Sequence, residues 1–139
     1  MKITAAVSYG ITAVAHIANA PSGEIVAAST ISEAHKMPRR FLLTILRSFV
    51  RHGIVASVRG VLGGYKLAKP AGKISLLEII EAVDGPLQCG LSSELPLAPK
   101  SNAAIRGTFA VIEADARKRL GAITVAHLRL SELKLAKGA

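Results

Sequence analysis

Residues 36–67 constrain the fold more than any other part of the sequence. They read KMPRRFLLTILRSFVRHGIVASVRGVLGGYKL, which predicts an amphipathic helix followed by two short strands joined by a glycine turn. Along the helix, basic and polar residues recur at spacings of four, three and four: Arg40, Thr44, Arg47 and Arg51. This spacing puts them on one face, opposite the apolar residues Leu42, Ile45, Leu46 and Phe49. We expect the apolar face to join a core and the basic face to meet an anion.

The charge of this stretch is one-sided. Nine Lys and Arg residues and no Asp or Glu stand between Glu33 and Glu78, in a chain with a net charge of +9 and a pI of about 10.2. This excess favours a polyanionic partner, and a basic helix followed by a basic hairpin is typical of a winged helix-turn-helix on double-stranded DNA. The alternative is a basic protein whose charged faces are only solvated.

The remaining composition excludes several classes of protein. The longest apolar runs fall far short of the ~20 residues that cross a bilayer, so we expect no membrane partner. Residues 1–20 are broken by polar side chains and predict an amphipathic helix rather than a signal peptide. The single cysteine excludes an internal disulfide and fits a reducing cytoplasm, where we expect the protein. We find no nucleophile elbow, P-loop, metal-ligand pair or paired carboxylates, so we expect no enzyme.

Local signals predict a complete small domain over residues 1–85. Three helices are predicted at residues 6–19, 27–35 and 38–52, with Pro38 at the first helical position of the third and Gly53 as its left-handed cap. Two strands are predicted at residues 54–58 and 65–68. Ser75 and Glu78 form a capping box that begins a fourth helix, which ends at Gly85.

Residues 86–101 are rich in proline and serine and predict a loop, followed by a C-terminal unit over residues 102–139. Helices are predicted there at residues 102–120 and 123–133. The first has an apolar seam: Ile105, Phe109, Ile112, Ala116 and Leu120. We expect this seam to pair with a second copy of the chain, the alternative being that it folds back on its own domain. The predicted fold is mainly α with a small β-hairpin wing: a winged helix-turn-helix domain plus a long C-terminal dimerisation helix.

The sequence resembles the Rrf2 family of bacterial transcription regulators over nearly its whole length. Residues 58–67, VRGVLGGYKL, are similar to the wing signature of that family, S-V-R-G-x-x-G-G-Y-x-L. Residues 31–33 and 74–85 resemble the helices before the recognition helix and after the wing, and residues 123–125 resemble the last segment. The resemblance implies a homodimer that binds a pseudo-palindromic promoter site, and we expect a repressor.

We expect the amino end of the recognition helix to enter the major groove, where Arg40 reads guanine through two hydrogen bonds. Arg39 would read a base or bind phosphate, and Thr44 would contact a thymine methyl group or a phosphate. Arg47 suits a phosphate and Arg51 a peripheral contact. The family often has an acidic residue near the position of Leu43, so no operator sequence is carried over to this chain.

On the wing, Arg59 is expected to insert into a narrow minor groove, where negative potential is concentrated. Gly63 and Gly64 are expected to allow positive φ and close approach of the backbone. Lys66 and Lys69 are expected to add phosphate contacts. For each of these residues, the alternative is a solvated surface position.

Several family members hold an iron–sulfur cluster on three cysteines in the loop before the dimer helix, and the resemblance puts Cys89 at the first of these positions. The second and third fall at about Leu95 and residues 101–103, where no cysteine occurs. The chain's four histidines share no ligand spacing: His16, His35, His52 and His127. We therefore predict no such cluster and no other cofactor. Cys89 is either a redox-sensing thiol or a bystander, and its loop is a candidate pocket or partner surface.

Three functions are compatible with these patterns. The leading one is a sequence-specific DNA-binding transcription regulator. The second is a protein–protein regulatory module, whose DNA binding depends on a partner enzyme or a small ligand. The third is recognition of structured RNA by shape. A steep loss of DNA affinity with salt, combined with a retained preferred site, would favour the first.

Overall fold

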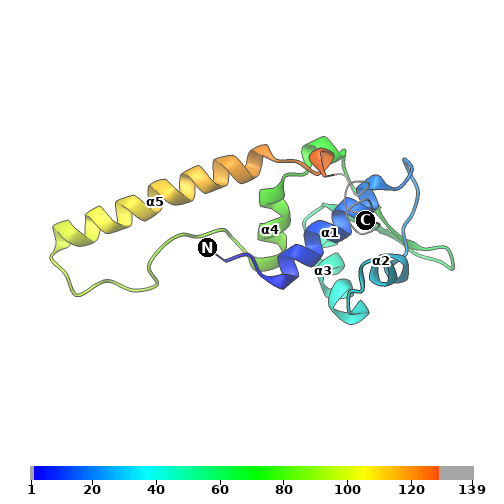
Figure 1. Ribbon diagram of the computed structural model, residues 1–139, viewed down its shortest axis with the longest axis horizontal. Coiled ribbons are helices and arrows are strands. Elements are labelled where there is room, and N and C mark those ends of the chain that lie inside the picture. Colours follow the sequence, from blue (N-terminus) through cyan, green and yellow to red (C-terminus); the bar gives the residue numbers. More distant parts are fainter. Residues whose placement is uncertain (1, 129–139) are drawn as a thin grey trace, which may run out of the picture.

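Five α-helices, one antiparallel hairpin and two short 3-10 helices make up the part of the chain that the computed structural model describes, residues 2–128 (Figure 1). The α-helices are α1 (Ala5–Asn19), α2 (Ala28–His35), α3 (Arg39–Arg51), α4 (Leu76–Asp84) and α5 (Pro99–Ala122). The strands are β1 (Val55–Val58) and β2 (Gly64–Leu67), and the 3-10 helices are η1 (Ala71–Lys73) and η2 (Val125–His127). The predicted fold class is confirmed, with each predicted helix of residues 1–85 present within one or two residues of its expected bounds.

The core lies where α1, α2, α3 and α4 meet β1. Its largest fully buried side chains come from all of these elements, from the residue after η1 and from the first residue of η2: Val7, Val14, Ile31, Leu42, Leu46, Phe49, Ile54, Val55, Ile74, Ile79 and Val125. The apolar face predicted for α3 is buried as expected: Leu42, Ile45, Leu46 and Phe49. Burial of this face fixes the rotation of α3, so its basic face must point away from the core.

A tight turn joins α2 to α3. Lys36 has a left-handed backbone with φ of 52°, and the Met37 N–H donates to the Ser32 carbonyl at 3.0 Å. The Ser32 hydroxyl in turn donates to the Met37 carbonyl at 2.6 Å. Pro38 was predicted as the first helical residue, but it is the cap: its ψ of 119° is extended, and its carbonyl accepts the first helical bond, from Leu42 N–H.

The chain passes from α3 into the hairpin through a glycine cap. Gly53 has φ of 70°, as predicted, and its N–H donates to the Val50 carbonyl at 3.1 Å. The Ile54 N–H donates to the Phe49 carbonyl at 2.9 Å, which completes a Schellman motif. Because Ile54 is itself buried, this cap holds the start of the hairpin firmly against the carboxyl end of α3.

The hairpin pairs Val55 with Leu67 and Val58 with Gly64. A third segment joins it, since Val26 and Tyr65 exchange two backbone hydrogen bonds of 2.8 Å. The chain just before α2 is thereby tied to the outer side of β2. The hairpin and the helix-turn-helix unit therefore share backbone contacts at two places, the Gly53 cap and this bridge.

The capping box predicted for α4 is present. Glu78 N–H donates to Ser75 Oγ at 3.1 Å, and Ser75 N–H donates to the Glu78 carboxylate at 3.0 Å. The segment after α5 returns to this point, where Val125 N–H donates to the Ile74 carbonyl at 2.9 Å. η2 occupies the start of the helix predicted at residues 123–133, and the remainder of that prediction lies outside the described residues.

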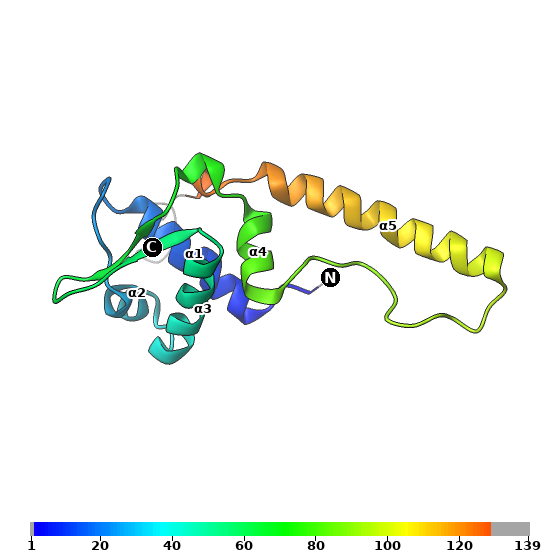
Figure 2. The same cartoon turned by 180° about the vertical axis from the view of Figure 1, so that it is seen from behind.

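α5 extends away from the helix-turn-helix domain and meets it only near its carboxyl end (Figures 1 and 2). It begins at Pro99, three residues before the predicted start, because proline suits the first helical turn, where no N–H is needed. None of its residues is buried. Within residues 2–128, no helix has the length and apolarity to cross a membrane.

Candidate nucleic-acid interface

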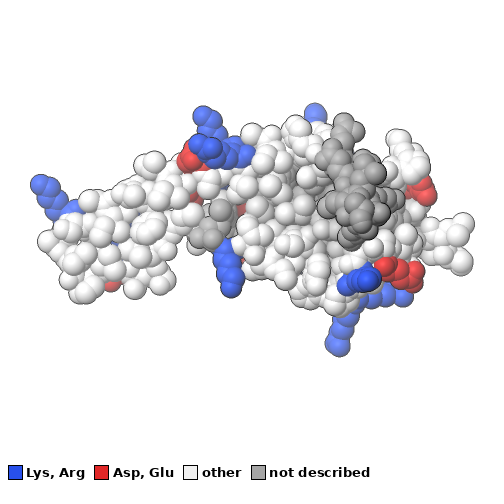
Figure 3. All heavy atoms as spheres, in the orientation of Figure 1, with Lys and Arg blue, Asp and Glu red and all other residues white. Residues whose placement is uncertain are grey.

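The basic face of α3 is open to solvent. Every predicted contact residue on this helix is exposed: Arg39, Arg40, Thr44, Arg47 and Arg51. Within the described part of the chain, no carboxylate forms an ion pair with any of these arginines. Lys and Arg atoms stand out from the lower edge of the domain, where α2 and α3 lie (Figure 3). The helix thus presents guanidinium groups whose hydrogen-bond donors are available to an external anion.

Thr44 uses its hydroxyl proton within the helix. Its Oγ1 donates to the Arg40 carbonyl at 3.2 Å. A hydroxyl in this arrangement has no proton left to donate to a phosphate. Of the two roles predicted for Thr44, the contact between its methyl group and a thymine is therefore the one its geometry favours.

A groove of about 540 Å³ separates α3 from the hairpin. It is lined by Thr44, Arg47, Val50, Arg51, Ser57 and Tyr65. The two guanidiniums of this groove and the hydroxyls of Ser57 and Tyr65 suit a sugar–phosphate strand, whose oxygens accept hydrogen bonds. Ser57 and Tyr65 are missing from the predicted site. Their positions could have been inferred, because the pairing of Ser57 with Tyr65 places both side chains on the same face of the hairpin.

The hairpin presents two further cations, since Arg59 and Lys66 are both exposed. Lys69, which like Lys66 was predicted to contact phosphate, is instead engaged within the protein: its Nζ donates to Glu78 Oε1 at 2.6 Å. Burial alone would raise the pKa of the Glu78 carboxyl. The hydrogen bonds from Lys69 and Ser75, together with the Lys69 charge, outweigh burial and lower this pKa below its usual 4.5.

Gly63 and Gly64, at the end of the hairpin turn, are needed for close packing rather than for a positive φ. Neither Gly63 nor Gly64 has a positive φ, so that prediction is wrong; the positive value, 123°, falls on Gly60. Close approach of the backbone does occur, but to the protein itself. A Cβ at Gly63 would lie 2.3 Å from the Val58 carbonyl oxygen, and one at Gly64 would lie 2.3 Å from that of Val26.

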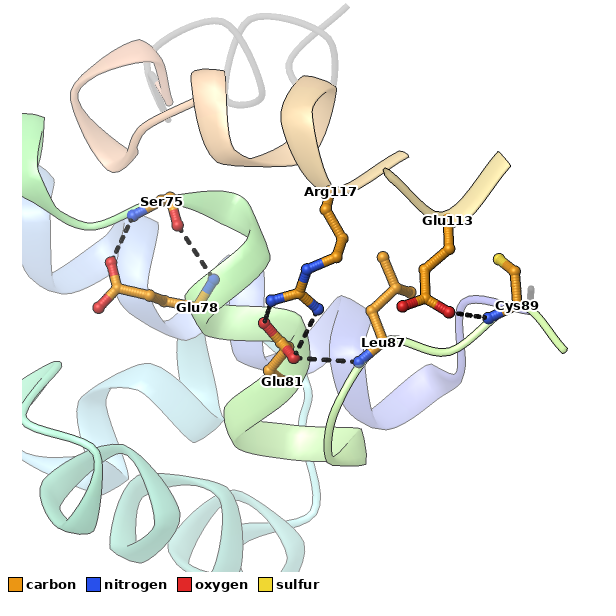
Figure 4. A network of polar contacts seen from close by, with 7 residues as sticks. All are labelled: Ser75, Glu78, Glu81, Leu87, Cys89, Glu113 and Arg117. Carbon is orange, nitrogen blue, oxygen red and sulfur yellow. Dashed lines mark hydrogen bonds and ion pairs between the residues drawn. The ribbon is translucent and has the colours of Figure 1, made fainter. Parts of the chain in front are cut away.

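The loop before α5 is fastened to α4 and α5 by a polar network (Figure 4). Glu81 accepts hydrogen bonds from Arg117 at 3.1 and 3.2 Å and from the Leu87 N–H at 3.1 Å. Cys89, which is half-buried, donates its backbone N–H to Glu113 Oε2 at 3.1 Å. Sequence reasoning did not find this network, because it joins residues far apart in the chain.

Few possible metal ligands lie together near Cys89 in the described residues. Within residues 2–128, no three His, Cys, Asp or Glu side chains are close enough together to share a metal ion. The Glu113 carboxylate contacts Cys89 by accepting a hydrogen bond from its backbone N–H, not from its thiol. The four histidines were predicted to be scattered, but two of them meet: His16 Nδ1 and His35 Nε2 are 2.8 Å apart, between α1 and α2.

The predicted dimer seam lies on a helix that is largely open. Of its residues, Ile112 is 49% exposed, and the others are half-buried: Ile105, Phe109, Ala116 and Leu120. Val111, which the prediction omitted, is 69% exposed. The apolar surface of α5 is therefore broader than the predicted seam. The loop contacts this helix, as in the hydrogen bond from Arg106 to the Ser93 carbonyl.

A helix-turn-helix unit, a glycine-turned hairpin beside its second helix and an exposed basic face together define the class of winged helix-turn-helix proteins. Residues 3–129 match the Rrf2 family, described as iron-dependent transcriptional regulators. The chain therefore belongs to the Rrf2 family of transcription regulators, as its resemblance to that family predicted.

Individual relatives agree with this assignment. A Mycobacterium tuberculosis (strain H37Rv) protein named as an HTH-type transcriptional regulator is 36% identical over 87 residues, which cover 63% of this chain and 54% of the relative. The match thus spans about half the length of that relative. A transcriptional regulator from Listeria innocua has a TM-score of 0.78 and 27% identity, over 92% of this chain and 85% of the other. CymR, the global cysteine regulator of B. subtilis, has a TM-score of 0.77 over 92% of this chain and 95% of its own, and at 23% identity it shows a shared fold.

Proposed function

We propose that this chain is a sequence-specific DNA-binding regulator that acts as a homodimer on a pseudo-palindromic promoter site. The observation that carries the proposal is the open basic face of α3 beside the groove to the hairpin. Such a face suits the major groove, while Arg47 and Arg51 at the groove suit the adjacent phosphates. A dimer bound across a bacterial promoter would exclude the polymerase, so we expect repression, in the cytoplasm and without catalytic activity.

The open surface of α5 supports the homodimer. A 24-residue helix with no buried residue, and with Val111 and Ile112 exposed, has an apolar surface that a second copy would cover. Pairing two such helices about a two-fold axis would set two α3 helices at a fixed separation. Half-sites on the DNA would then recur at a spacing of about one helical turn, 10–10.5 base pairs, or a multiple of it.

We also propose that this member of the family holds no three-cysteine iron–sulfur cluster. A cluster needs about four donors, usually thiolates, and each chain offers one cysteine. Protein purified without oxygen should be colourless and should contain iron far below one atom per chain. Stoichiometric iron with a visible charge-transfer band would contradict this proposal, and Cys89→Ala would then show whether the single thiol takes part.

The function is tested by selecting the DNA that the full chain binds from its own genome. We expect a small set of fragments that share an inverted repeat, bound by a species with twice the mass of the chain. Affinity should fall steeply with salt, with a log–log slope of about −0.9 for each phosphate contact. Equal recovery of all fragments would contradict sequence-specific binding. Selective recovery only after cell extract is added would instead favour the partner-dependent module.

A further inference from the structure

The outer end of the hairpin carries two large apolar side chains in water. Val61 and Leu62 have relative exposures of 104% and 90%. The next most exposed large apolar residue among residues 2–128 is Val111, at 69%. The hairpin projects beyond the helices in both ribbon views (Figures 1 and 2), and its outer end shows no charged atoms on the face seen in Figure 3.

The backbone that carries these two side chains is held in a closed turn. Gly63 N–H donates to the Gly60 carbonyl at 3.0 Å, which closes a four-residue turn with Val61 and Leu62 at its centre. A Cβ at Gly63 would be 2.8 Å from the same Gly60 carbonyl oxygen, so the turn is packed against its own backbone. The apolar pair is therefore held at the end of a narrow, closely packed arm.

The backbone does not require apolar residues here. Turn centres usually hold Gly, Asn, Asp, Pro or Ser, each for a conformational reason. Neither Val61 nor Leu62 has a positive φ, so polar residues would fit the same backbone. A position that breaks the local rules of turn chemistry without any gain in packing is expected to serve a function.

The surroundings of the pair point to DNA rather than to an apolar protein surface. Arg59 precedes it and Lys66 follows it, and both are exposed. No acidic residue occurs between Glu33 and Glu78, so the whole arm is cationic. At the turn itself only the two apolar side chains need to enter the minor groove of B-DNA, which is about 6 Å wide.

We propose that Val61 and Leu62 form an apolar wedge that enters the minor groove, loosens the stacking of a base step and bends the duplex. The inference rests on the proposed DNA binding and adds a contact to it. Apolar side chains inserted between base steps kink DNA by about 20–90°. Two wedges in a dimer, one in each half-site, would favour operators with easily unstacked pyrimidine–purine steps at positions that no arginine touches.

The wedge is tested with the double variant Val61→Ser, Leu62→Ser on a duplex enriched by the full chain. Both positions face solvent, so the variant should fold and associate as the unaltered protein does. We expect DNA affinity to fall about ten- to a hundredfold, from the lost apolar burial. Energy transfer between dyes at the two duplex ends should report a smaller bend than with the unaltered protein. The unaltered protein should raise the fluorescence of a 2-aminopurine placed at the unstacked step, and the double variant should not.

Controls separate the wedge from the other contacts. The double variant should keep the salt slope, because apolar side chains release no counterions, whereas Arg59→Ala should reduce it by about one. Val61→Ile with Leu62→Met should preserve the bend, and Ile3→Ser, at another exposed apolar position, should change nothing. Unchanged affinity and bending in the double serine variant would overturn the wedge, as would a loss confined to binding of a protein partner. Absence of DNA binding by the unaltered chain would instead overturn the proposed function.

Discussion

The guanidinium group of Arg117, on α5, makes two hydrogen bonds to the carboxylate of Glu81, on α4, at 3.1 and 3.2 Å (Figure 4). The same carboxylate accepts the N–H of Leu87, at the start of the loop. One residue of α4 therefore holds both the long helix and the loop. On the next residue, the Ala82 carbonyl accepts the hydroxyl of Ser48 from α3. A displacement of α5 or of the loop would therefore act on a residue adjacent to the one that contacts α3, the helix proposed to face DNA.

Arg117→Ala should destabilise the protein by about 1–2 kcal/mol, because it leaves the Glu81 charge with a single backbone donor. Arg119 provides a matched control. It pairs with Asp115 at 2.8 Å, but the two side chains are 78% and 57% exposed, against 40% and 24% for Arg117 and Glu81. Arg119→Ala should cost less than about 0.5 kcal/mol. Urea unfolding of the three proteins measures both effects, and equal losses would contradict a special role for Glu81.

Gly64→Ala should disturb the root of the hairpin. The new methyl group would meet the Val26 carbonyl oxygen at 2.3 Å, in a backbone that is paired on both sides. We expect a loss of about 1–3 kcal/mol in unfolding free energy, together with weaker DNA binding. Gly72→Ala is the control, since a Cβ there meets nothing within 4 Å and the backbone has no positive φ. That variant should be neutral or slightly stabilising. If Gly64→Ala left the free energy of unfolding unchanged, the bridge to Val26 would be able to shift at little cost, against this expectation.

Stability should fall at acid pH partly through Glu78. Because the pKa of its carboxyl is lower in the folded protein than the usual 4.5, the ionised form favours folding. Its contribution is complete above pH 4.5 and disappears as the pH falls through the folded value. Glu78→Gln should lose stability at neutral pH and show a shallower decline below pH 4.5. Glu24→Gln, at an exposed position, should follow the unaltered protein in urea titrations across this range.

Arg40→Ala should remove preference for particular bases while leaving the dimer intact. Loss of a two-bond contact to guanine costs about 1–3 kcal/mol of discrimination against other bases. Arg47→Ala should instead weaken binding to all sequences to a similar extent, because a phosphate contact carries no base information. Competition between specific and random duplexes in fluorescence anisotropy distinguishes the two. Unchanged discrimination in Arg40→Ala would assign base reading to another residue.

The elements of the first domain follow from local patterns in the sequence. The stretch from Arg40 to Arg51 shows the helical period clearly. Gly53 stands where a helix cap needs a left-handed residue, and Ser75 with Glu78 is a complete capping box. In each case, residues a few positions apart determine the structure. Short-range rules are therefore sufficient for most of this fold.

Most of the missed features depend on contacts between residues that are distant in the sequence. Lys69 appeared free for phosphate because its partner, Glu78, lies nine residues away across η1. Glycine is needed at position 64 for a steric reason, not a conformational one, because the bridge from Val26 to Tyr65 brings the Val26 carbonyl close to it. His16 and His35 meet only because α1 packs beside α2. No periodicity or spacing contains these relationships, since they arise when the elements pack.

The Schellman cap at Gly53 joins α3 to the hairpin without a flexible linker. Every proposed DNA-facing group lies in this one continuous segment, residues 39–66. The rest of the domain contacts this segment mainly through the four buried side chains of α3, the buried side chains of Ile54 and Val55, and the backbone at Tyr65. The segment is therefore a structural unit that carries all the proposed DNA contacts. Its exposed residues could be exchanged together between relatives that keep the buried ones. The exchange would transfer operator choice and leave the proposed dimer helix and the loop before it unchanged. Diversification of promoters under such a protein would then require change in one short stretch of gene.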